Sequence, residues 1–561
     1  MIQNKLMKKG CLCILLMLVG VSVYASNLTV CFYDAELPVL INRQENIICE
    51  IIINSELGGE VVNELFLVQN GITQEVGTAS RIFYSGTSSV LRSQTPSQAI
   101  SEGVREVGGS QSFFCHPSYS IKKGEISGIP SKMCFPVRTR LVKGQNYFWI
   151  SFEVNPSTSL DTRFTVALDK VEVDHASISI RKVKNKVLTH RVGYGLRQSG
   201  DDGAYSYRIP GLITTNKGTL LAVYDVRHQT NIDLQEDIDI GMSRSCDGGK
   251  TWEPMKIIMD MGEYNGLPQS QNGIGDPAIL VDSETNTIWT SAVWVHGLAN
   301  ARAWGSVRPG MTPEDATGQI MLVNSTDDGV TWSNPVNITS MVKTDDMPML
   351  LQGPGRGITM ENGTLVFPVQ YKSINNNQRG EISIIYSKDH GVTWHRATSV
   401  STDDVVSEPQ VAEIAPGILM INARTSASYR FVATTDNLGK KWKLHSSSGK
   451  SLIEPGCMGS LLHIGEKENI LKKDILLFSN PNFADIRPSM SSRRNITIKA
   501  SLDGGCSWRD EYQLILDEEQ GWGYSCLTRI DDETIGILYE GSTAQMVFQR
   551  IKLNDLISFD N

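Results

Sequence analysis

The sequence predicts an all-β protein, with a six-bladed β-propeller preceded by an N-terminal β-sandwich. Two observations lead to this prediction. A short turn pattern recurs through the C-terminal two thirds of the chain, whereas β-rich segments without that pattern fill the first third. The repeats are considered first, because a repeated unit indicates the architecture of the whole repeated region.

The repeated pattern is Ser-x-Asp-x-Gly-x-Thr-Trp, with small variations. Its near-perfect copies span residues 245–252, 325–332, 387–394 and 501–508. A degraded copy at 434–442 carries Asp436, Gly439 and an extra residue. Asp and Ser side chains bond nearby backbone amides, Gly supplies a positive φ, and the Trp ring covers the turn. Each copy therefore predicts a stapled hairpin turn.

A short β-rich run precedes each copy. These runs are 238–242, 320–323, 382–386, 431–433 and 496–500. Successive Asp positions of the pattern are 80, 62, 47 and 67 residues apart, which leaves room for a four-stranded sheet and its loops. Four-stranded sheets repeated radially form a propeller. We expect about six blades, one of them without a recognisable turn.

The first 25 residues have the order of a secretory signal peptide. Lys5, Lys8 and Lys9 precede an apolar run at 11–23, and small residues end at Ala25. We therefore expect an exported protein, periplasmic or secreted. No later segment approaches the ~20 apolar residues of a membrane span. Loss of the three lysines changes the formal charge from -9 to -12, and no basic block remains for nucleic acid.

Residues 26–185 are predicted to form the sandwich domain, and residues 186–561 the propeller. The predicted sandwich strands include 47–53, 61–68, 147–154 and 165–173. Glycan binding by this domain is an interpretation from its position. Its aromatic segments, 113–114 and 147–149, are interpreted as core in preference to a sugar platform. Cys115 and Cys134 are left open as either a disulfide or two thiols.

One segment of the propeller region suggests chemistry. Tyr207-Arg-Ile-Pro-Gly211 is followed by Arg227 and then by Asp233. Together with the repeated turns, this segment resembles the exo-sialidases (neuraminidases) of glycoside hydrolase family 33 type, over residues 190–561. The resemblance implies hydrolysis of terminal α-linked sialic acids from glycoproteins, glycolipids and oligosaccharides. Such propellers also occur in non-enzymatic receptors, so activity depends on particular residues.

The family's arginine triad has three counterparts in this sequence. Arg208 matches the first member, Arg424 the second and Arg493 the third, with Arg494 as a neighbouring alternative to the third. We prefer Arg493 because strand alternation would turn Arg494 the other way. Three converging guanidinium groups repel one another unless an anion binds them. The resemblance implies that this anion is the sialic acid carboxylate.

Glu408 and Tyr524 match the family's nucleophile pair. The anomeric carbon of a sialoside carries a carboxylate, so an ionised Asp or Glu attacking it would meet repulsion that a phenol avoids. Because free Tyr titrates near ~10, it needs a base within hydrogen-bond reach. Sialidases are accordingly an exception to the two-carboxylate arrangement of glycosidases. Glu413, five residues from Glu408, is the competing base.

Asp233 matches the family's acid/base, which protonates the leaving oxygen and later activates water. That task calls for a raised pKa, which partial desolvation would give. Asp237 and Asp239 stand close by, and Asp237 is the rival for this role.

Three further residues complete the predicted site. Arg227 is placed among the substrate-binding residues. Asp276 matches a family position near the glycerol and N-acyl side of the sugar, with a turn residue before Pro277 as the alternative reading. Glu540 matches the carboxylate that orients the first arginine.

The resemblance implies sialylated glycans as partners, and we expect a monomer. No metal ligand motif or cofactor motif appears in the sequence, so neither is expected. Two alternatives stay open. An intramolecular trans-sialidase would use the same residues in a drier site, and a non-catalytic sialoglycan-binding propeller would keep the arginines alone.

Overall fold

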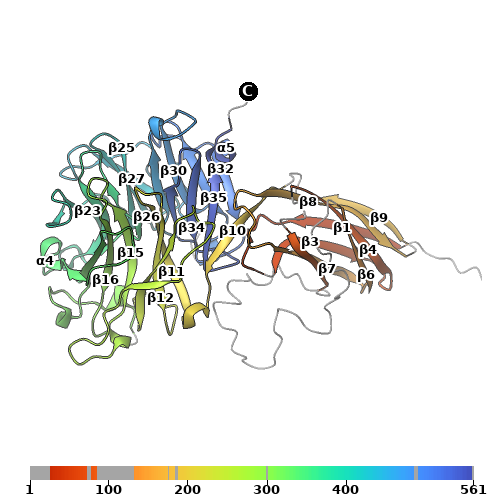
Figure 1. The fold of residues 1–561 in the computed structure, drawn as a ribbon, viewed down its shortest axis with the longest axis horizontal. Helices are drawn as coiled ribbons and strands as arrows, with labels where there is room; N and C mark the ends of the chain where they lie inside the picture. Colours follow the sequence, from red (N-terminus) through yellow and green to blue (C-terminus); the bar gives the residue numbers. More distant parts are fainter. Residues whose placement is uncertain are drawn as a thin grey trace, which may run out of the picture.

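A computed structural model describes residues 26–558, apart from 44, 72–76, 85–131, 175, 183–187, 235, 299–300 and 485–489. Its strands form a two-sheet sandwich and, beside it, a ring of antiparallel sheets (Figure 1). The all-β prediction is therefore confirmed. The expected signal peptide, Cys115 and the aromatic pair 113–114 lie outside the described residues.

The sandwich forms from the first third of the chain, as the sequence predicts. One sheet has the order β5 (Gly77–Tyr84), β7 (Gly144–Val154), β3 (Asn46–Ser55), β1 (Ser26–Asp34) and β9 (Ala176–Lys182). The facing strands are β10 (His190–Arg197), β8 (Arg163–Val173), β4 (Val61–Asn70) and β6 (Lys132–Arg140), and β2 (Val39–Leu40) pairs with β10. Tyr147, Phe148 and Trp149 are buried, so this aromatic segment is core.

The ring consists of successive sheets in chain order. The first sheet contains β11 (Ser206–Thr214), β12 (Leu220–Arg227), β13 (Ile238–Ser245) and β14 (Lys256–Met259). The second sheet contains β15 (Ile274–Val281), β16 (Ile288–Trp294), β17 (Gln319–Ser325) and β18 (Val336–Asn337), with β20 (Gly355–Arg356) beside β15. The third sheet contains β19 (Met349–Gln352), β22 (Leu365–Lys372), β23 (Glu381–Ser387) and β24 (His395–Arg396), with β21 (Ile358–Thr359) beside β22. The fourth sheet contains β25 (Val406–Ala415), β26 (Ile418–Thr425), β27 (Phe431–Thr435) and β28 (Lys443–Leu444). The last two are β29 (Ser460–Ile464), β30 (Ile475–Pro481), β31 (Ile496–Ser501) and β32 (Gln513–Asp517), then β33 (Ser525–Arg529), β34 (Thr534–Tyr539) and β35 (Met546–Lys552).

Helical segments among the described residues are each a single turn. They are α3 (Ala303–Ser306), α4 (Thr339–Val342) and α5 (Leu553–Leu556), with 3-10 turns at Asp201–Gly203, Gln269–Gln271, Pro313–Asp315, Ile374–Asn376, Glu466–Glu468, Met490–Ser492 and Asp510–Tyr512. Among the described residues, no helix is long and apolar enough to cross a membrane.

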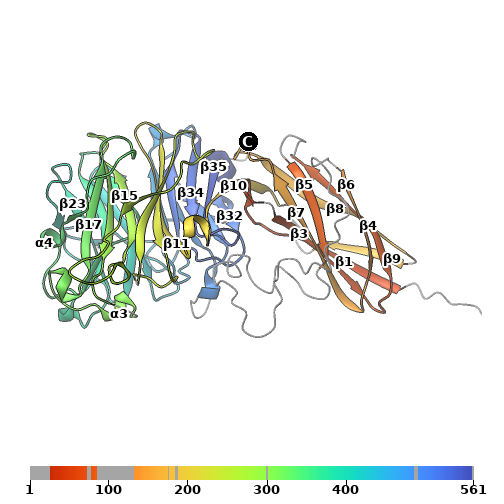
Figure 2. The ribbon, with the colours of Figure 1, turned by 60° about the horizontal axis from the view of Figure 1, so that its bottom comes forward.

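Strand β10 joins the sandwich to the ring, which the sequence did not indicate. Its first residues, His190 and Arg191, pair with β8 of the sandwich, whereas Tyr194 and Arg197 pair with β35 of the last ring sheet. The last sheet thus takes its outer strand from before the first sheet, which closes the ring. Figure 2 shows β10 and β35 at the contact between the two parts. The predicted boundary at 185 falls outside the described residues.

The repeated turns have the predicted hydrogen bonds. In the third near-perfect copy, Asp389 accepts from the amide of Thr393 at 2.9 Å and from its hydroxyl at 2.6 Å. The amide of Gly391, at a φ of 89°, donates to Ser387 Oγ at 2.8 Å, and Trp394 Nε1 donates to the Gly391 carbonyl at 3.1 Å. These hydrogen bonds lower the pKa of Asp389 to about 2. Each turn is therefore stapled locally.

The degraded copy differs from the alignment that the sequence suggested. Thr435 Oγ1 accepts from the amide of Gly439 at 3.1 Å, and Asn437 Oδ1 accepts from the amide of Lys441 at 2.9 Å. Asn437 therefore takes the place of the repeat's Asp. Asp436, which the sequence alignment put there, instead pairs with Lys443 at the surface at 2.9 Å. With Asn437 in the place of the repeat's Asp, the spacing to Gly439 matches the other copies, so this copy has no extra residue.

This correction predicts unequal effects of two adjacent substitutions. Asn437→Ala removes the turn's acceptor, and we expect it to lower the free energy of unfolding by about 1 kcal/mol. Asp436→Ala removes only an exposed ion pair, so its effect should stay within about 0.5 kcal/mol. Urea unfolding of the two variants checks this. A larger loss for Asp436→Ala would restore the original alignment.

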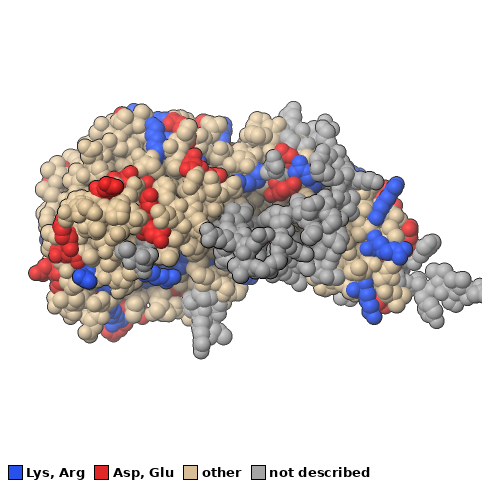
Figure 3. Space-filling model, turned by 90° about the horizontal axis from the view of Figure 1, so that it is seen from below, with Lys and Arg blue, Asp and Glu red and all other residues tan. Residues whose placement is uncertain are grey.

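Charged side chains on the face drawn in Figure 3 lie in small separate groups of both signs, without a continuous basic area. This distribution agrees with the acidic formal charge of -9.

Candidate active site

Several predicted site residues gather at one end of the ring because they occupy equivalent positions on its inner strands. Arg208, Asp276 and Glu408 are each the third residue of their strands, β11, β15 and β25, and Tyr524 directly precedes β33. Contacts join β11 to β15, β25 to β29, β29 to β33 and β33 to β11. The N-terminal ends of these inner strands therefore face a common point.

An irregularity recurs at this end of the inner strands. The pairing register shifts between Arg208 and Gly211 in β11 and close to Asp276 and Glu408 in the other two strands. Ile209, Asp276 and Glu408 have positive φ values of 62°, 56° and 38°. A positive φ is costly for a β-branched residue such as Ile209. Bulges of this kind turn a side chain out of the ladder, here toward the site.

Tyr524 and Glu408 form a hydrogen-bonded pair at the centre of the site. The Tyr524 hydroxyl donates to Glu408 Oε1, and Arg424 Nη1 donates to Glu408 Oε2 at 2.8 Å. Burial and the Glu408 charge raise the pKa of Tyr524 well above its ordinary value. Burial would raise the pKa of Glu408, but Arg424 and the Tyr524 hydroxyl outweigh it and lower this pKa. A neutral phenol thus faces an ionised carboxylate, the arrangement that a phenol nucleophile needs.

The competing base, Glu413, lies at the other end of β25. Its carboxylate accepts from the amides of Glu361 and Gly417, each at 2.7 Å. It lines a cavity of about 940 Å³ together with the C-terminal ends of the inner strands, including Thr214 and Arg529. Glu413 therefore faces away from Tyr524.

The three predicted arginines surround Tyr524. The guanidinium carbons of Arg208 and Arg493 lie 5.5 and 5.4 Å from the centre of its ring, and Arg424 reaches the same centre through Glu408. The side chain of Arg424 is 29% exposed, whereas Arg208 and Arg493 are buried. Three guanidinium groups around one hydroxyl make a site for an anionic ligand.

Arg493 and Arg494 point to different surroundings. Arg493 donates to the carbonyls of Trp522 and Gly456, each at 2.9 Å. Arg494 lies over the ring of Phe483, 5.4 Å from its centre. Of the two neighbours, only Arg493 contacts Tyr524, as preferred. Both arginines precede β31, however, so strand alternation is not the reason.

Glu540 lies beneath Arg208, as the sequence predicts. Its Oε1 accepts from Arg208 Nε at 2.7 Å and from the amide of Ile209 at 2.8 Å, and its Oε2 accepts from the amide of Tyr524 at 3.0 Å. Glu540 is fully buried. One carboxylate therefore fixes both Arg208 and the backbone of Tyr524. Trp522 adds a further contact, with its ring 4.3 Å from the Arg208 guanidinium carbon.

Arg227 is fully buried, in contrast to the prediction that it binds substrate. Its guanidinium donates to Asp225 Oδ2 at 2.7 Å and to the Asn231 carbonyl at 2.6 Å, and it contacts Asp233 at 2.8 Å. Because its side chain has no exposed surface, it holds the loop that carries Asp233. Arg227 is thus a positioning residue for Asp233.

Asp233 lies at the mouth of the site, with 67% of its side chain exposed and 3.8 Å from Arg208. The expected raised pKa is not found. Contact with the protein surface acts to raise the pKa, but Arg227 and Arg208 outweigh this and lower it to about 2. Asp233 is therefore ionised near neutral pH, because two guanidinium groups neighbour it.

Asp276 lies beside Asp225. Its amide donates to Asp225 Oδ1 at 2.9 Å, and its carbonyl accepts from Gln352 Nε2. Burial and the Asp225 charge raise the pKa of Asp276 well above its ordinary value. Asp276 therefore contributes a carboxyl group with a raised pKa beside Asp225, in addition to its role in the bulge.

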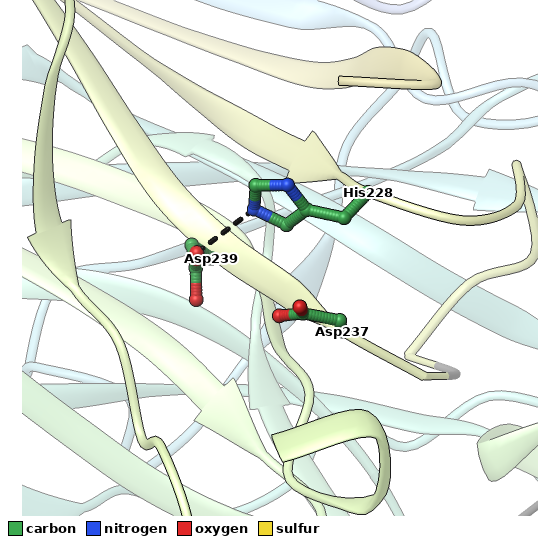
Figure 4. Close-up of side chains that lie close together, drawn as sticks. All are labelled: His228, Asp237 and Asp239. Carbon is green, nitrogen blue, oxygen red and sulfur yellow. Dashed lines mark hydrogen bonds and ion pairs between the residues drawn. The ribbon is translucent and has the colours of Figure 1, made fainter. Parts of the chain in front are cut away.

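Asp237, the rival of Asp233, and Asp239 lie in a separate cluster with His228, at the base of the same loop (Figure 4). His228 Nε2 is 2.9 Å from Asp239 Oδ2. Asp239 is 4% exposed, and its burial raises its pKa to about 6. In this structure, only Asp233 among the three carboxylates contacts Arg208 and Arg227.

Sequence reasoning missed several supporting residues. Asp225 stands two residues before Arg227 on one strand, so alternation places both side chains on one face, and this signal was available. Gln370 Oε1 accepts from the Glu408 amide at 3.0 Å and supports the bulge. Trp522 and Gln370 carry no local signal, since their roles arise from segments distant in sequence.

A family model described as an N-terminal domain of BNR-repeat neuraminidase matches residues 28–177, and one described as a BNR repeat-like domain matches residues 209–504. The chain is 45% identical over 531 residues to a sialidase of Bacteroides fragilis, covering 94% of this chain and 95% of that protein. It is 30% identical over 355 residues to a sialidase of Micromonospora viridifaciens, covering 62% of this chain and 52% of that protein.

The solved structure of Hadza microbial sialidase Hz136 matches with a TM-score of 0.83 and 43% identity, over 94% of this chain and 100% of that chain. An intramolecular trans-sialidase from Ruminococcus gnavus, at 19% identity and a TM-score of 0.53 over 64% of this chain, shares the fold. The repeated turns, the preceding sandwich and the match over nearly the whole length all indicate the same family. The chain belongs to the BNR-repeat neuraminidase (sialidase) family.

Proposed function

We propose that this protein is an exo-α-sialidase that removes terminal α-linked sialic acids from glycoproteins, glycolipids and oligosaccharides with retention of anomeric configuration. The observation that carries the proposal is the hydrogen bond from the Tyr524 hydroxyl to Glu408, at a point surrounded by three arginines. The enzymatic family supports the reaction class, and the site supports the roles given below.

In the first step, Arg208, Arg424 and Arg493 bind the C1 carboxylate of the terminal sugar through charge-assisted hydrogen bonds. Tyr524 Oη attacks the anomeric carbon while its proton passes to Glu408. Asp233 gives a proton to the leaving glycosidic oxygen, so a sialyl-tyrosine and a free aglycone result. The neutral phenol avoids the repulsion that an attacking carboxylate would meet beside the substrate's own carboxylate.

In the second step, water attacks the anomeric carbon, and Asp233 takes its proton. Tyr524 leaves and recovers its proton from Glu408, and Asp233 loses its proton to solvent when the product leaves, so the free enzyme is restored. Two inversions give net retention.

The protonation of Asp233 requires an explanation, because its pKa of about 2 leaves it ionised before substrate binds. The substrate carboxylate would neutralise Arg208 and bring a negative charge close to Asp233. Both effects raise the pKa of a carboxyl group. The sugar also excludes water from Asp233, and this desolvation raises the pKa further. We therefore propose that substrate binding itself prepares the acid.

Export to the periplasm or outside the cell is part of the proposal, on the strength of residues 1–25 alone. We propose that the protein acts there as a monomer on sialylated glycans. With an acidic formal charge of -9, attraction of an anionic sugar depends on the local field of the arginines.

Product analysis tests the proposal. The purified protein is incubated with α2,3- and α2,6-sialyllactose, and the first-formed sugar is followed by NMR. We expect free sialic acid that appears first as the α anomer, and the relative rates will give the linkage preference. Release of an anhydro sugar would show that the reaction is intramolecular transfer and not hydrolysis. Binding without cleavage would leave a sialoglycan-binding propeller.

A further inference from the structure

His228, Asp237 and Asp239 bring one imidazole and two carboxylates together at the base of the Asp233 loop (Figure 4). One ligand atom from each lies within 4.8 Å of the others. The cluster joins both ends of the loop, because the His228 amide donates to the Asp237 carbonyl at 3.1 Å and Val226 pairs with Asp239. It is the sole group of this kind within the residues that the structure describes.

Two buried oxygens in this cluster lack hydrogen bonds. Asp239 is 96% buried, and its Oδ1 has no partner, although its Oδ2 contacts His228. Asp237 Oδ1 is likewise buried without a partner. An unsatisfied buried carboxylate oxygen costs more than an ordinary polar atom, so native structures rarely leave one. Two such atoms in one cluster indicate that a positive partner is missing there.

Charge leads to the same conclusion. Among the described residues, neither Asp237 nor Asp239 forms an ion pair with Lys or Arg, and neither does the neighbouring Asp260. Even a protonated His228 would balance only one of these carboxylates, and no lysine or arginine among the described residues pairs with the others. Close carboxylates without a counter-ion repel one another and loosen the loop ends. A divalent cation would compensate this charge.

The donor set favours one class of cation. Ca²⁺ and Mg²⁺ prefer oxygen ligands and a large or octahedral shell, whereas imidazole with carboxylates suits Zn²⁺ and related ions. Bonds to Zn²⁺ are about 2.0–2.2 Å long, so side-chain shifts of about 1 Å would bring all three ligands to one ion. His228 is 32% exposed, which gives the ion a path from solvent.

We propose that His228, Asp237 and Asp239 bind a divalent transition-metal ion, with Zn²⁺ preferred, that ties the two ends of the Asp233 loop together. The ion is structural. It bridges the end of β12 to the start of β13 and thereby limits where Asp233 can stand relative to Arg208. This inference concerns ion binding by three side chains and stands whether or not the proposed function is correct.

Calorimetric titration of the purified protein tests the site after EDTA treatment and removal of the chelator. We expect one Zn²⁺ per chain, weaker Mn²⁺ binding in keeping with the order of transition-metal affinities, and no saturable binding of Ca²⁺ or Mg²⁺. His228→Gln and Asp239→Asn should each lower Zn²⁺ affinity by more than the ~10-fold that loss of an outer-shell partner costs. Hydrogen exchange of residues 228–239 should slow when Zn²⁺ is added.

His463→Gln is the matched control. His463 also pairs with an aspartate, Asp474, at 2.7 Å, but no second carboxylate completes a cluster there within the described residues. Its variant should bind Zn²⁺ like the parent. If Asp239→Asn does not fold, Asp237→Asn takes its place, because Asp237 is less buried. No Zn²⁺ binding by the parent, or equal binding by the parent and the cluster variants, would overturn the proposal.

Discussion

Tyr524→Phe is expected to slow hydrolysis of sialyllactose by at least ~10²-fold, because loss of a nucleophile removes the covalent route. The substitution removes one oxygen and leaves the ring between Arg208 and Arg493. Substrate binding should therefore persist while turnover is lost. Steady-state rates and a binding measurement with sialyllactose check both parts.

Tyr371→Phe is the control for the loss of a buried hydroxyl. Tyr371 donates to Glu381 at 2.7 Å on β22 and takes no part in the site. Its variant should keep the parent's rate. Activity of Tyr524→Phe within tenfold of the parent would contradict the assignment of the nucleophile.

Asp233→Ala is expected to lower the rate on sialyllactose by about 10²–10⁴-fold, the usual contribution of a general acid and base. With an aryl sialoside the loss should be much smaller in the bond-breaking step, because a phenolate leaves without protonation. Comparing the rate ratio of the two substrates, parent against variant, isolates the acid role from any change in folding.

The acid role of Asp233 predicts the direction in which kcat changes with pH. In the free enzyme the pKa of Asp233 is about 2. If bound substrate raises that pKa, kcat should fall as pH rises through the raised value, and Asp233→Asn should remove this limb. Asp436→Ala, which removes an exposed carboxylate at a repeated turn, should leave the profile unchanged. Equal losses on both substrates for Asp233→Ala would contradict the acid role.

The sequence predicted most of the fold because its signal is local. Each repeated turn makes its hydrogen bonds within eight residues, so the residue types alone indicate the hairpin. The degraded copy shows the limit of this reasoning. The sequence alignment placed Asp436 at the position of the repeat's Asp, although the spacing to Gly439 and Trp442 matches Asn437, because a carboxylate was sought where an amide oxygen serves equally well.

Closure of the ring could not be read from the sequence. Strand β10 pairs with β35, some 350 residues later, and such pairing carries no local pattern. The bulges at Ile209 and Glu408 were hidden for the same reason, because a β-branched residue or a Glu at positive φ contradicts local preference. Packing of the surrounding sheets imposes these conformations where the site needs them.

For the site, the sequence by itself determined the chemical types and their order along the chain, including Arg208, Glu408 and Tyr524. Only the tertiary structure decided among close neighbours: Arg493 faces Tyr524 and Arg494 does not, and Arg227 supports Asp233 from a buried position. It also reversed the expected pKa of Asp233. The physical reason is that motifs specify residue types, whereas contacts, burial and pKa depend on charges and backbones that folding brings together from distant segments.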